Sequence, residues 1–190
     1  MLPRALSLAP ASGRIRSTPE DFIVQELPAF EATGEGEHLL LTVQKRGMNT
    51  AFCAERIAKW AGIDARDVSF AGMKDRHAIT TQRFSARLPK KTAPDVSLLN
   101  SNDCTVLDAQ WHSRKLARGA LAGNRFTLTL RELQCQVDVL EKALQIVQRE
   151  GLPNYFGEQR FGRDGDNVES ARRMFAGQRV RREQRSIYLS

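Results

Sequence analysis

The densest cluster of side chains that could do chemistry is the run Gly72-Met73-Lys74-Asp75-Arg76-His77, which Thr80 and Gln82 follow closely. Asp75 is the central residue of the cluster. A carboxylate between two cationic neighbours is favoured in its ionised form, and it can act as a nucleophile or a base. Most charged surface turns have no such role, so the residue types alone favour a solvated turn. The cluster is therefore a candidate site that needs independent support.

Apolar segments on both sides would hold this cluster in place. Residues 68–71 are predicted to form a short buried strand, and residues 82–88 the next strand. Upstream, a helix is predicted from the caps Asn49 and Thr50 to Gly62, because its apolar residues recur at helical spacing. The other predicted elements are strands at 22–27, 37–44, 105–111 and 124–130, a loop at 89–102, a helix at 136–150 and a short helix from Asn167. This order predicts an α+β fold with a mixed, largely antiparallel sheet flanked by helices.

The composition narrows the classes of protein. The 190 residues carry 29 Lys and Arg against 22 Asp and Glu, a formal net charge of +7, which favours an anionic partner such as nucleic acid. No apolar run approaches the roughly 18 residues of a membrane span, and Pro3 and Pro10 interrupt the only N-terminal apolar stretch. We therefore expect a cytoplasmic protein with no membrane partner. The cysteines, at positions 53, 104 and 135, are too widely spaced for a zinc site or a disulfide framework, so free thiols and no metal are expected.

Four motifs, which follow one another along the chain in the order typical of the family, resemble those of the TruD family of tRNA pseudouridine synthases. The G-x-K-D-R segment around Asp75, continuing through Ala78, Thr80 and Gln82, resembles the family signature. The other three matches are the P-E-D-F-x-V-x-E opening at 18–26, the basic stretch 114–126 and the N-Y-F-G-x-Q-R-F-G stretch within 153–162. The resemblance runs from about residue 14 to residue 190.

This resemblance implies a reaction and a domain plan. The reaction is isomerisation of uridine to pseudouridine at position 13 of tRNA, without a cofactor and with Asp75 as the catalytic residue. The target base leaves its stack to enter the pocket, as in other enzymes that act on a base. The domain plan is an N-terminal tail (1–13), the N-terminal part of the pseudouridine synthase catalytic domain (14–165) and the start of an inserted domain (166–190), with the rest of that insertion and the C-terminal part of the catalytic domain absent.

The resemblance also implies the residues that contact the substrate. Phe22 would stack on uracil, although a phenylalanine in a strand is more often a core residue. Lys74 and Arg76 would orient Asp75 or hold a phosphate, and no histidine is required. Asn154 and Phe156 belong to the second active-site motif. Residues expected to follow the RNA backbone are Arg114, Lys115, Arg118 and Arg160.

Two other kinds of function fit the charge. The chain could be a catalytically incomplete tRNA-binding fragment or RNA chaperone, which would bind in a salt-dependent way and leave the nucleosides unchanged. It could also be a basic structural protein of a ribonucleoprotein particle, but that reading leaves the cluster around Asp75 unexplained. For both the isomerase and the tRNA-binding fragment, the expected partner is tRNA, with no obligate protein partner. Formation of pseudouridine distinguishes these two.

Overall fold

The computed structural model describes residues 11–152 and 165–178. Asn154, Phe156 and Arg160, which the sequence predicts as site residues, lie outside these ranges. The chain divides into two compact units, one of residues 10–135 and one of residues 136–190 with residues 1–9. The cluster around Asp75 lies in the first unit.

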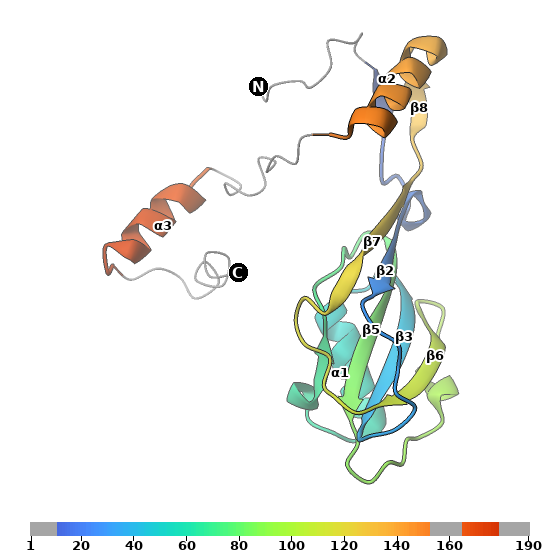
Figure 1. Cartoon of the computed structure of the whole chain (residues 1–190), viewed down its shortest axis with the longest axis vertical. Coiled ribbons are helices and arrows are strands. Elements are labelled where there is room, and N and C mark those ends of the chain that lie inside the picture. Colours follow the sequence, from blue (N-terminus) through green and yellow to red (C-terminus); the bar gives the residue numbers. More distant parts are fainter. Residues whose placement is uncertain (1–10, 153–164, 179–190) are drawn as a thin grey trace. The chain divides into compact units, whose positions relative to one another are not determined.

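A mixed sheet forms the centre of the first unit (Figure 1). Its strands follow the order β6-β3-β5-β2-β7, and β4 also pairs with β5. Only β2 and β5 run parallel, and the other neighbours are antiparallel. The strands are β2 (Phe22–Pro28), β3 (His38–Arg46), β4 (Val68–Phe70), β5 (Ile79–Arg87), β6 (Cys104–His112) and β7 (Leu121–Leu128). The predicted α+β class with a mixed, largely antiparallel sheet is confirmed.

Helix α1 (Thr50–Ala61) packs against this sheet. It begins where the Asn49 side chain accepts a hydrogen bond from the Ala51 N–H at 2.8 Å, and it ends where Gly62 takes a left-handed conformation with φ 65°. The predicted caps Asn49 and Gly62 are therefore confirmed, whereas Thr50 is the first residue of the helix and not a cap. The apolar residues of α1, β3, β4 and β5 form one core, in which the side chains of Leu41 and Phe84 are completely buried.

Two short strands were not predicted. β1 (Ser12–Arg14) and β8 (Arg131–Gln134) form a separate antiparallel pair. Neither strand has a buried residue, so neither carries the apolar alternation that predicts a strand. Three short 3-10 helices, at Pro19–Asp21, Ala65–Asp67 and Val96–Leu99, were also not predicted, and the last of them lies within the expected loop 89–102.

Two strand boundaries differ from the prediction for reasons of pairing. β5 begins at Ile79, three residues early, because residues 79–81 pair with β2 in parallel. β7 begins at Leu121 rather than at residue 124, because its first residues pair with the end of β2. The predicted helices are confirmed as α2 (Val137–Glu150) and α3 (Asn167–Phe175), both in the second unit.

The structure also describes the state of the three cysteines and the length of the helices. Cys53 and Cys104 are buried, Cys135 is half-buried, and all three are free thiols, as predicted. Among the residues placed by the structure, no helix is long and apolar enough to cross a membrane.

A buried carboxylate fastens the start of β2 to β8. Both oxygens of Asp21 accept hydrogen bonds from Arg131, at 2.7 to 2.9 Å, and Oδ2 also accepts from the Thr18 N–H at 3.1 Å. Only 2% of Asp21 is exposed. These bonds, those from Arg131 foremost, hold the pKa of Asp21 below its ordinary value. The segment that leads into Phe22 is thereby held at a fixed place.

We expect Asp21→Asn to lower the melting temperature at neutral pH and to have a smaller effect in acid. A carboxyl whose pKa is lowered in the folded state stabilises that state above its unfolded pKa of about 3.9, and this contribution is lost as the pH falls through the folded pKa. Thermal unfolding at pH 7 and at pH 3 measures the difference. The exposed Asp108→Asn is the control, and an effect of Asp21→Asn that is equal at both pH values would contradict the assignment.

Candidate active site

Asp75 lies in the loop between β4 and β5, with its side chain 47% exposed. Its Oδ1 lies 3.8 Å from Nη1 of Arg16. The guanidinium carbon of Arg16 lies in turn 4.1 Å from the ring centroid of Phe22, at the start of β2. The structure thus brings two of the sequence motifs together through a cation that belongs to neither of them.

The parallel pairing of β2 with β5 explains why these motifs meet. Ile23 pairs with Ile79, so the start of β2 lies beside the start of β5, and the loop that carries Asp75 leads directly into β5. Phe22 is only 6% exposed, because Arg16 covers its ring and Phe126 of β7 stacks against it with centroids 6.0 Å apart. Phe22 is therefore a buried ring, which packs with Val24 and Ala78, and its contact with uracil stays a prediction.

Sequence reasoning missed Arg16. It follows β1 and has a left-handed backbone with φ 57°, a conformation that residues other than glycine rarely adopt. Strained backbone persists where the surrounding structure requires it, often at functional sites. The only signal in the sequence is a cation shortly before the P-E-D-F segment, which is too weak to single it out. Arg16 is the cation nearest to Asp75 among the ion pairs that the described residues form.

A buried hydrogen-bond network holds the loop that carries Asp75. The hydroxyl of Thr50, the first residue of α1, accepts from the Lys74 N–H at 3.0 Å and donates to Oε1 of Gln82 at 3.0 Å. The amide of Gln82 donates to the Gly72 carbonyl at 3.2 Å. Thr50 and Gln82 are 0% and 1% exposed. The loop is therefore bonded on both sides of Met73 before the chain reaches Asp75.

We expect Thr50→Val to destabilise the protein by about 1–3 kcal/mol, because it leaves the Lys74 N–H and the Gln82 amide oxygen without a buried partner. Chemical denaturation measures the change in the free energy of unfolding. Thr105→Val, at an exposed position of β6, is the control. Equal effects of the two substitutions would show that the network does not support the loop.

In the ion pairs of the described residues, Asp75 is paired with Arg16 and not with its sequence neighbours Lys74 and Arg76. The Lys74 ammonium lies 2.8 Å from Oε2 of Glu26 on β2, in an ion pair whose side chains are 6% and 3% exposed. The other oxygen of Glu26 accepts from the Arg83 N–H at 3.1 Å. Arg76 lines a cavity of about 390 Å³ together with Arg46. Substrate contact by Lys74 and Arg76 stays a prediction, and in the structure Lys74 ties the Asp75 loop to β2.

A second buried amine lies near the loop. Lys45, at the end of β3, is 1% exposed and donates to the Met48 carbonyl at 2.8 Å. Its pKa is lowered to about 8, mainly by burial; the nearby Lys74 acts in the same direction, while Asp75 favours the charged form. The Met48 turn is joined to the end of the Asp75 loop by a hydrogen bond from the Gly47 N–H to the Ala78 carbonyl at 3.1 Å. Sequence reasoning assigned Lys45 no role.

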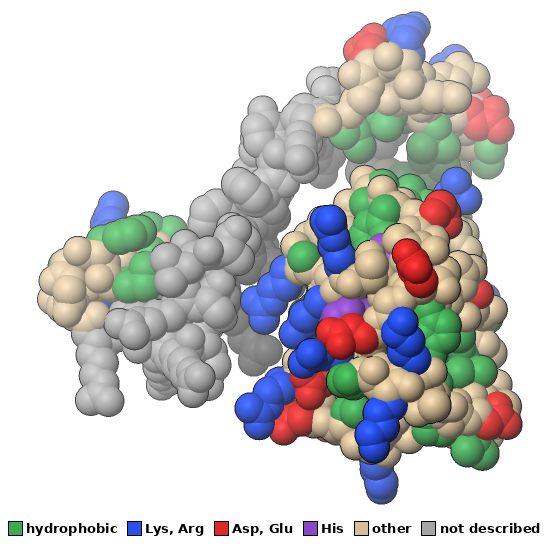
Figure 2. Space-filling model, turned by 60° about the horizontal axis from the view of Figure 1, so that its bottom comes forward, with side chains coloured by type: hydrophobic (Ala, Val, Ile, Leu, Met, Phe, Trp, Pro, Cys, Tyr) green, Lys and Arg blue, Asp and Glu red, His purple; other side chains and the backbone are tan. Residues whose placement is uncertain are grey.

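The basic stretch of residues 114–118 connects β6 to β7. Arg114, Lys115 and Arg118 are exposed, while Leu116 between them is 2% exposed and anchors the connection. Lys and Arg side chains project from the surface of this unit, with Asp and Glu side chains among them (Figure 2). Contact of these three residues with RNA stays a prediction. Within residues 11–152 and 165–178, no group of three His, Cys, Asp or Glu side chains could hold a metal ion.

Comparison with known proteins identifies the family. The family model described as tRNA pseudouridine synthase D (TruD) matches residues 2–171. The chain belongs to this family. The tRNA pseudouridine synthase D of Xanthomonas axonopodis pv. citri (strain 306) is 54% identical over 100% of this chain and 56% of its own length. That of Methylococcus capsulatus (strain ATCC 33009 / NCIMB 11132 / Bath) is 51% identical over 100% of this chain and 54% of its own length.

A solved structure has the same fold. The crystal structure of the putative tRNA pseudouridine synthase D from Methanosarcina mazei matches with a TM-score of 0.74 and 27% identity, over 90% of this chain and 40% of that chain. The chain therefore spans about half the length of the curated relatives it matches.

Proposed function

We propose that the chain acts as a tRNA pseudouridine synthase that isomerises uridine at position 13 of tRNA in the cytoplasm, with Asp75 as the catalytic residue and without a cofactor. The observation that carries this proposal is the arrangement of the Asp75 carboxylate, the Arg16 guanidinium and the Phe22 ring, since Arg16 lies 3.8 Å from Asp75 and 4.1 Å from the ring centroid. Family membership supplies the class of reaction.

The reaction exchanges one bond of the nucleotide for another. The bond between N1 of uracil and C1′ of ribose breaks, the detached base turns, and C5 bonds to C1′. The hydrogen on C5 is lost to solvent and N1 gains a proton, so no oxidant or reductant is needed. Asp75 is the group that acts on the nucleotide, and its ion pair with Arg16 keeps the carboxylate in place before the substrate arrives.

The stacked pair of Phe22 and Phe126 would receive the flipped base. Uracil stacked on an aromatic ring gains about 1–3 kcal/mol, which offsets the cost of leaving the RNA stack. Phe22 is covered by Arg16, and Phe126 is 54% exposed. Arg16 must therefore move aside from Phe22, or the base must stack on Phe126.

Mapping of the product tests this proposal. Transfer RNA is incubated with the protein, treated with a carbodiimide that marks pseudouridine, and read by primer extension. The proposal expects one new stop, one nucleotide on the 3′ side of position 13, which marks pseudouridine at that position. A chain that binds tRNA in a salt-dependent way and gives no new stop would instead be a tRNA-binding fragment or an RNA chaperone.

A further inference from the structure

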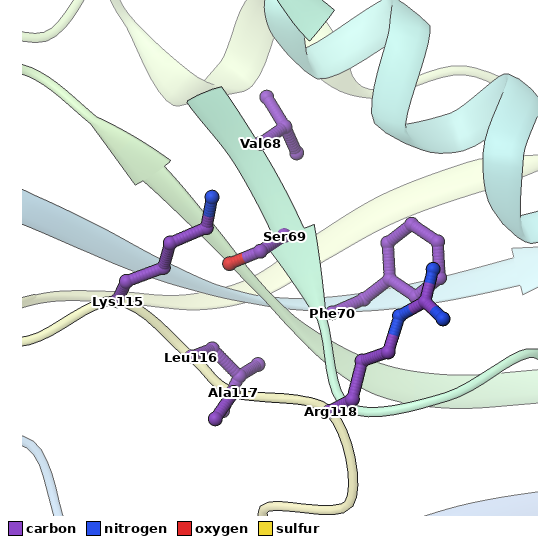
Figure 3. Close-up of a pocket in the computed structure, with 7 residues that line it drawn as sticks. All are labelled: Val68, Ser69, Phe70, Lys115, Leu116, Ala117 and Arg118. Carbon is purple, nitrogen blue, oxygen red and sulfur yellow. The ribbon is translucent and has the colours of Figure 1, made fainter. Parts of the chain in front are cut away.

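A cavity of about 370 Å³ lies between β4 and the basic connection of residues 114–118 (Figure 3). We call it the β4 cavity. One wall is the strand β4, and the other is the connection, which contributes two cations. Its lining residues are Val68, Ser69, Phe70, Lys115, Leu116, Ala117 and Arg118. Its volume is in the range of ordinary small-ligand pockets.

The two walls of the β4 cavity are fixed to each other. The Gly119 N–H donates to the Ala71 carbonyl at 2.7 Å, which joins the end of the connection to the residue after β4. Leu116 and Ala71 are 2% and 4% exposed and pack in one apolar cluster with Leu40. The Lys115 ammonium also donates to the Arg66 carbonyl at 3.2 Å. The cavity is therefore formed before any ligand binds.

One buried hydroxyl, from a residue that lines the cavity, has no hydrogen-bond partner among the described residues. Oγ of Ser69 is shielded from water and makes no hydrogen bond to any part of the chain that the structure describes. A buried polar group without a partner is unfavourable, and native structures rarely retain one without a reason. In Figure 3 this hydroxyl points toward the Lys115 side chain, and Arg118 and Phe70 line the same cavity. Ser69 lines the cavity, so rotation about its Cα–Cβ bond would present the hydroxyl to a ligand with a hydrogen-bonding group.

We infer that the β4 cavity binds one nucleotide of the tRNA other than the target uridine. This inference rests on the proposed function. Lys115 and Arg118 are suited to a phosphodiester, Ser69 to a hydrogen bond with the base or ribose, and Phe70 to an apolar contact.

The cavity is separate from the catalytic site but close to it. Asp75 is not among the residues that line it. Phe70 and Asp75 are five positions apart in the sequence, so their Cα atoms lie at most about 18 Å apart. One RNA strand can reach from the cavity to Asp75 within a few nucleotides. The bound nucleotide would therefore fix the position of the strand relative to the catalytic carboxylate.

Two substitutions separate the charge of the cavity from its hydroxyl. Arg118→Gln should weaken tRNA binding about tenfold and lower the slope of log K against log salt by about 0.7 to 0.9, the value of one phosphate. Ser69→Ala should weaken binding severalfold without changing that slope, and without lowering the melting temperature. Lys90→Gln removes one charge from an exposed position and should change neither the affinity nor the slope appreciably. Fluorescence anisotropy over a range of salt concentrations measures all four proteins.

Acetylation of Lys115 distinguishes the sources of the nucleotide. Mass spectrometry after brief amine acetylation should show Lys115 protected by tRNA and Lys90 unprotected. Uridine monophosphate and inorganic phosphate are tested in parallel, and protection by either at micromolar concentration would overturn the assignment to an RNA strand. Binding by Arg118→Gln and Ser69→Ala that equals that of the parent would overturn the inference while leaving the proposed function standing. A parent protein that does not bind tRNA would overturn both.

Discussion

Asp75→Asn is expected to reduce pseudouridine formation by about a thousandfold or more, because the amide can neither attack the nucleotide nor accept a proton from it. The substitution preserves the shape of the side chain and removes its charge. Affinity for tRNA should change by less than about threefold, since phosphate contacts dominate binding. Single-turnover kinetics at saturating protein, with a separate binding titration, measures the two effects.

The control for this prediction is Asp108→Asn, which removes one exposed carboxylate from β6. It changes the net charge by the same amount as Asp75→Asn and should leave the rate unchanged. If Asp75→Asn lowers affinity and rate in equal proportion, Asp75 serves binding rather than chemistry. A rate within tenfold of the parent would exclude it as the catalytic residue.

Glu26→Gln is expected to destabilise the protein by about 3–5 kcal/mol, the usual cost of breaking a buried ion pair. Glutamine keeps the acceptor for the Arg83 N–H, so the loss is that of the charge alone. The Lys74 ammonium, 6% exposed, would be left buried without its counter-ion. Chemical denaturation measures the free energy of unfolding, and activity should fall with it because Lys74 immediately precedes Asp75.

The double substitution Glu26→Gln with Lys74→Met tests whether the cost of Glu26→Gln comes from the unpaired Lys74 ammonium. It removes the unpaired ammonium, so it should recover most of the stability lost in Glu26→Gln. The exposed pair Arg66 and Asp64 provides the control, and Asp64→Asn should cost at most about 1 kcal/mol. If Glu26→Gln costs no more than that, the pair is not a structural tie for the loop.

The sequence predicts the main elements of the fold because they bury apolar faces. The caps of α1 are recognisable in the sequence, because the Asn49 side chain can accept a backbone hydrogen bond and Gly62 can adopt a left-handed conformation. The central strands carry the apolar residues of the core. β1 and β8 bury nothing, and the early start of β5 depends on a parallel partner more than fifty residues away in the sequence. Local patterns carry no information on such pairings.

The candidate site was predicted less completely than the fold. Motifs singled out Asp75 and Phe22, and the parallel pairing of β2 with β5 explains why they meet. Nothing in the residue types distinguishes Arg16 from the other arginines of a basic chain. The two neighbours of Asp75 illustrate the same limit, because adjacency in sequence suggests that Lys74 faces the carboxylate, whereas the structure pairs it with Glu26.

Release of tritium from tRNA labelled at C5 of uracil tests the central claim most directly, because C5 loses its hydrogen only when the new bond to C1′ forms. Parent protein, Asp75→Asn and a sample without protein are compared at equal tRNA occupancy. We expect release from the parent alone. Equal release from the parent and from Asp75→Asn would contradict the role of Asp75. No release from either protein, with salt-sensitive binding intact, would contradict the proposed isomerase activity of this chain.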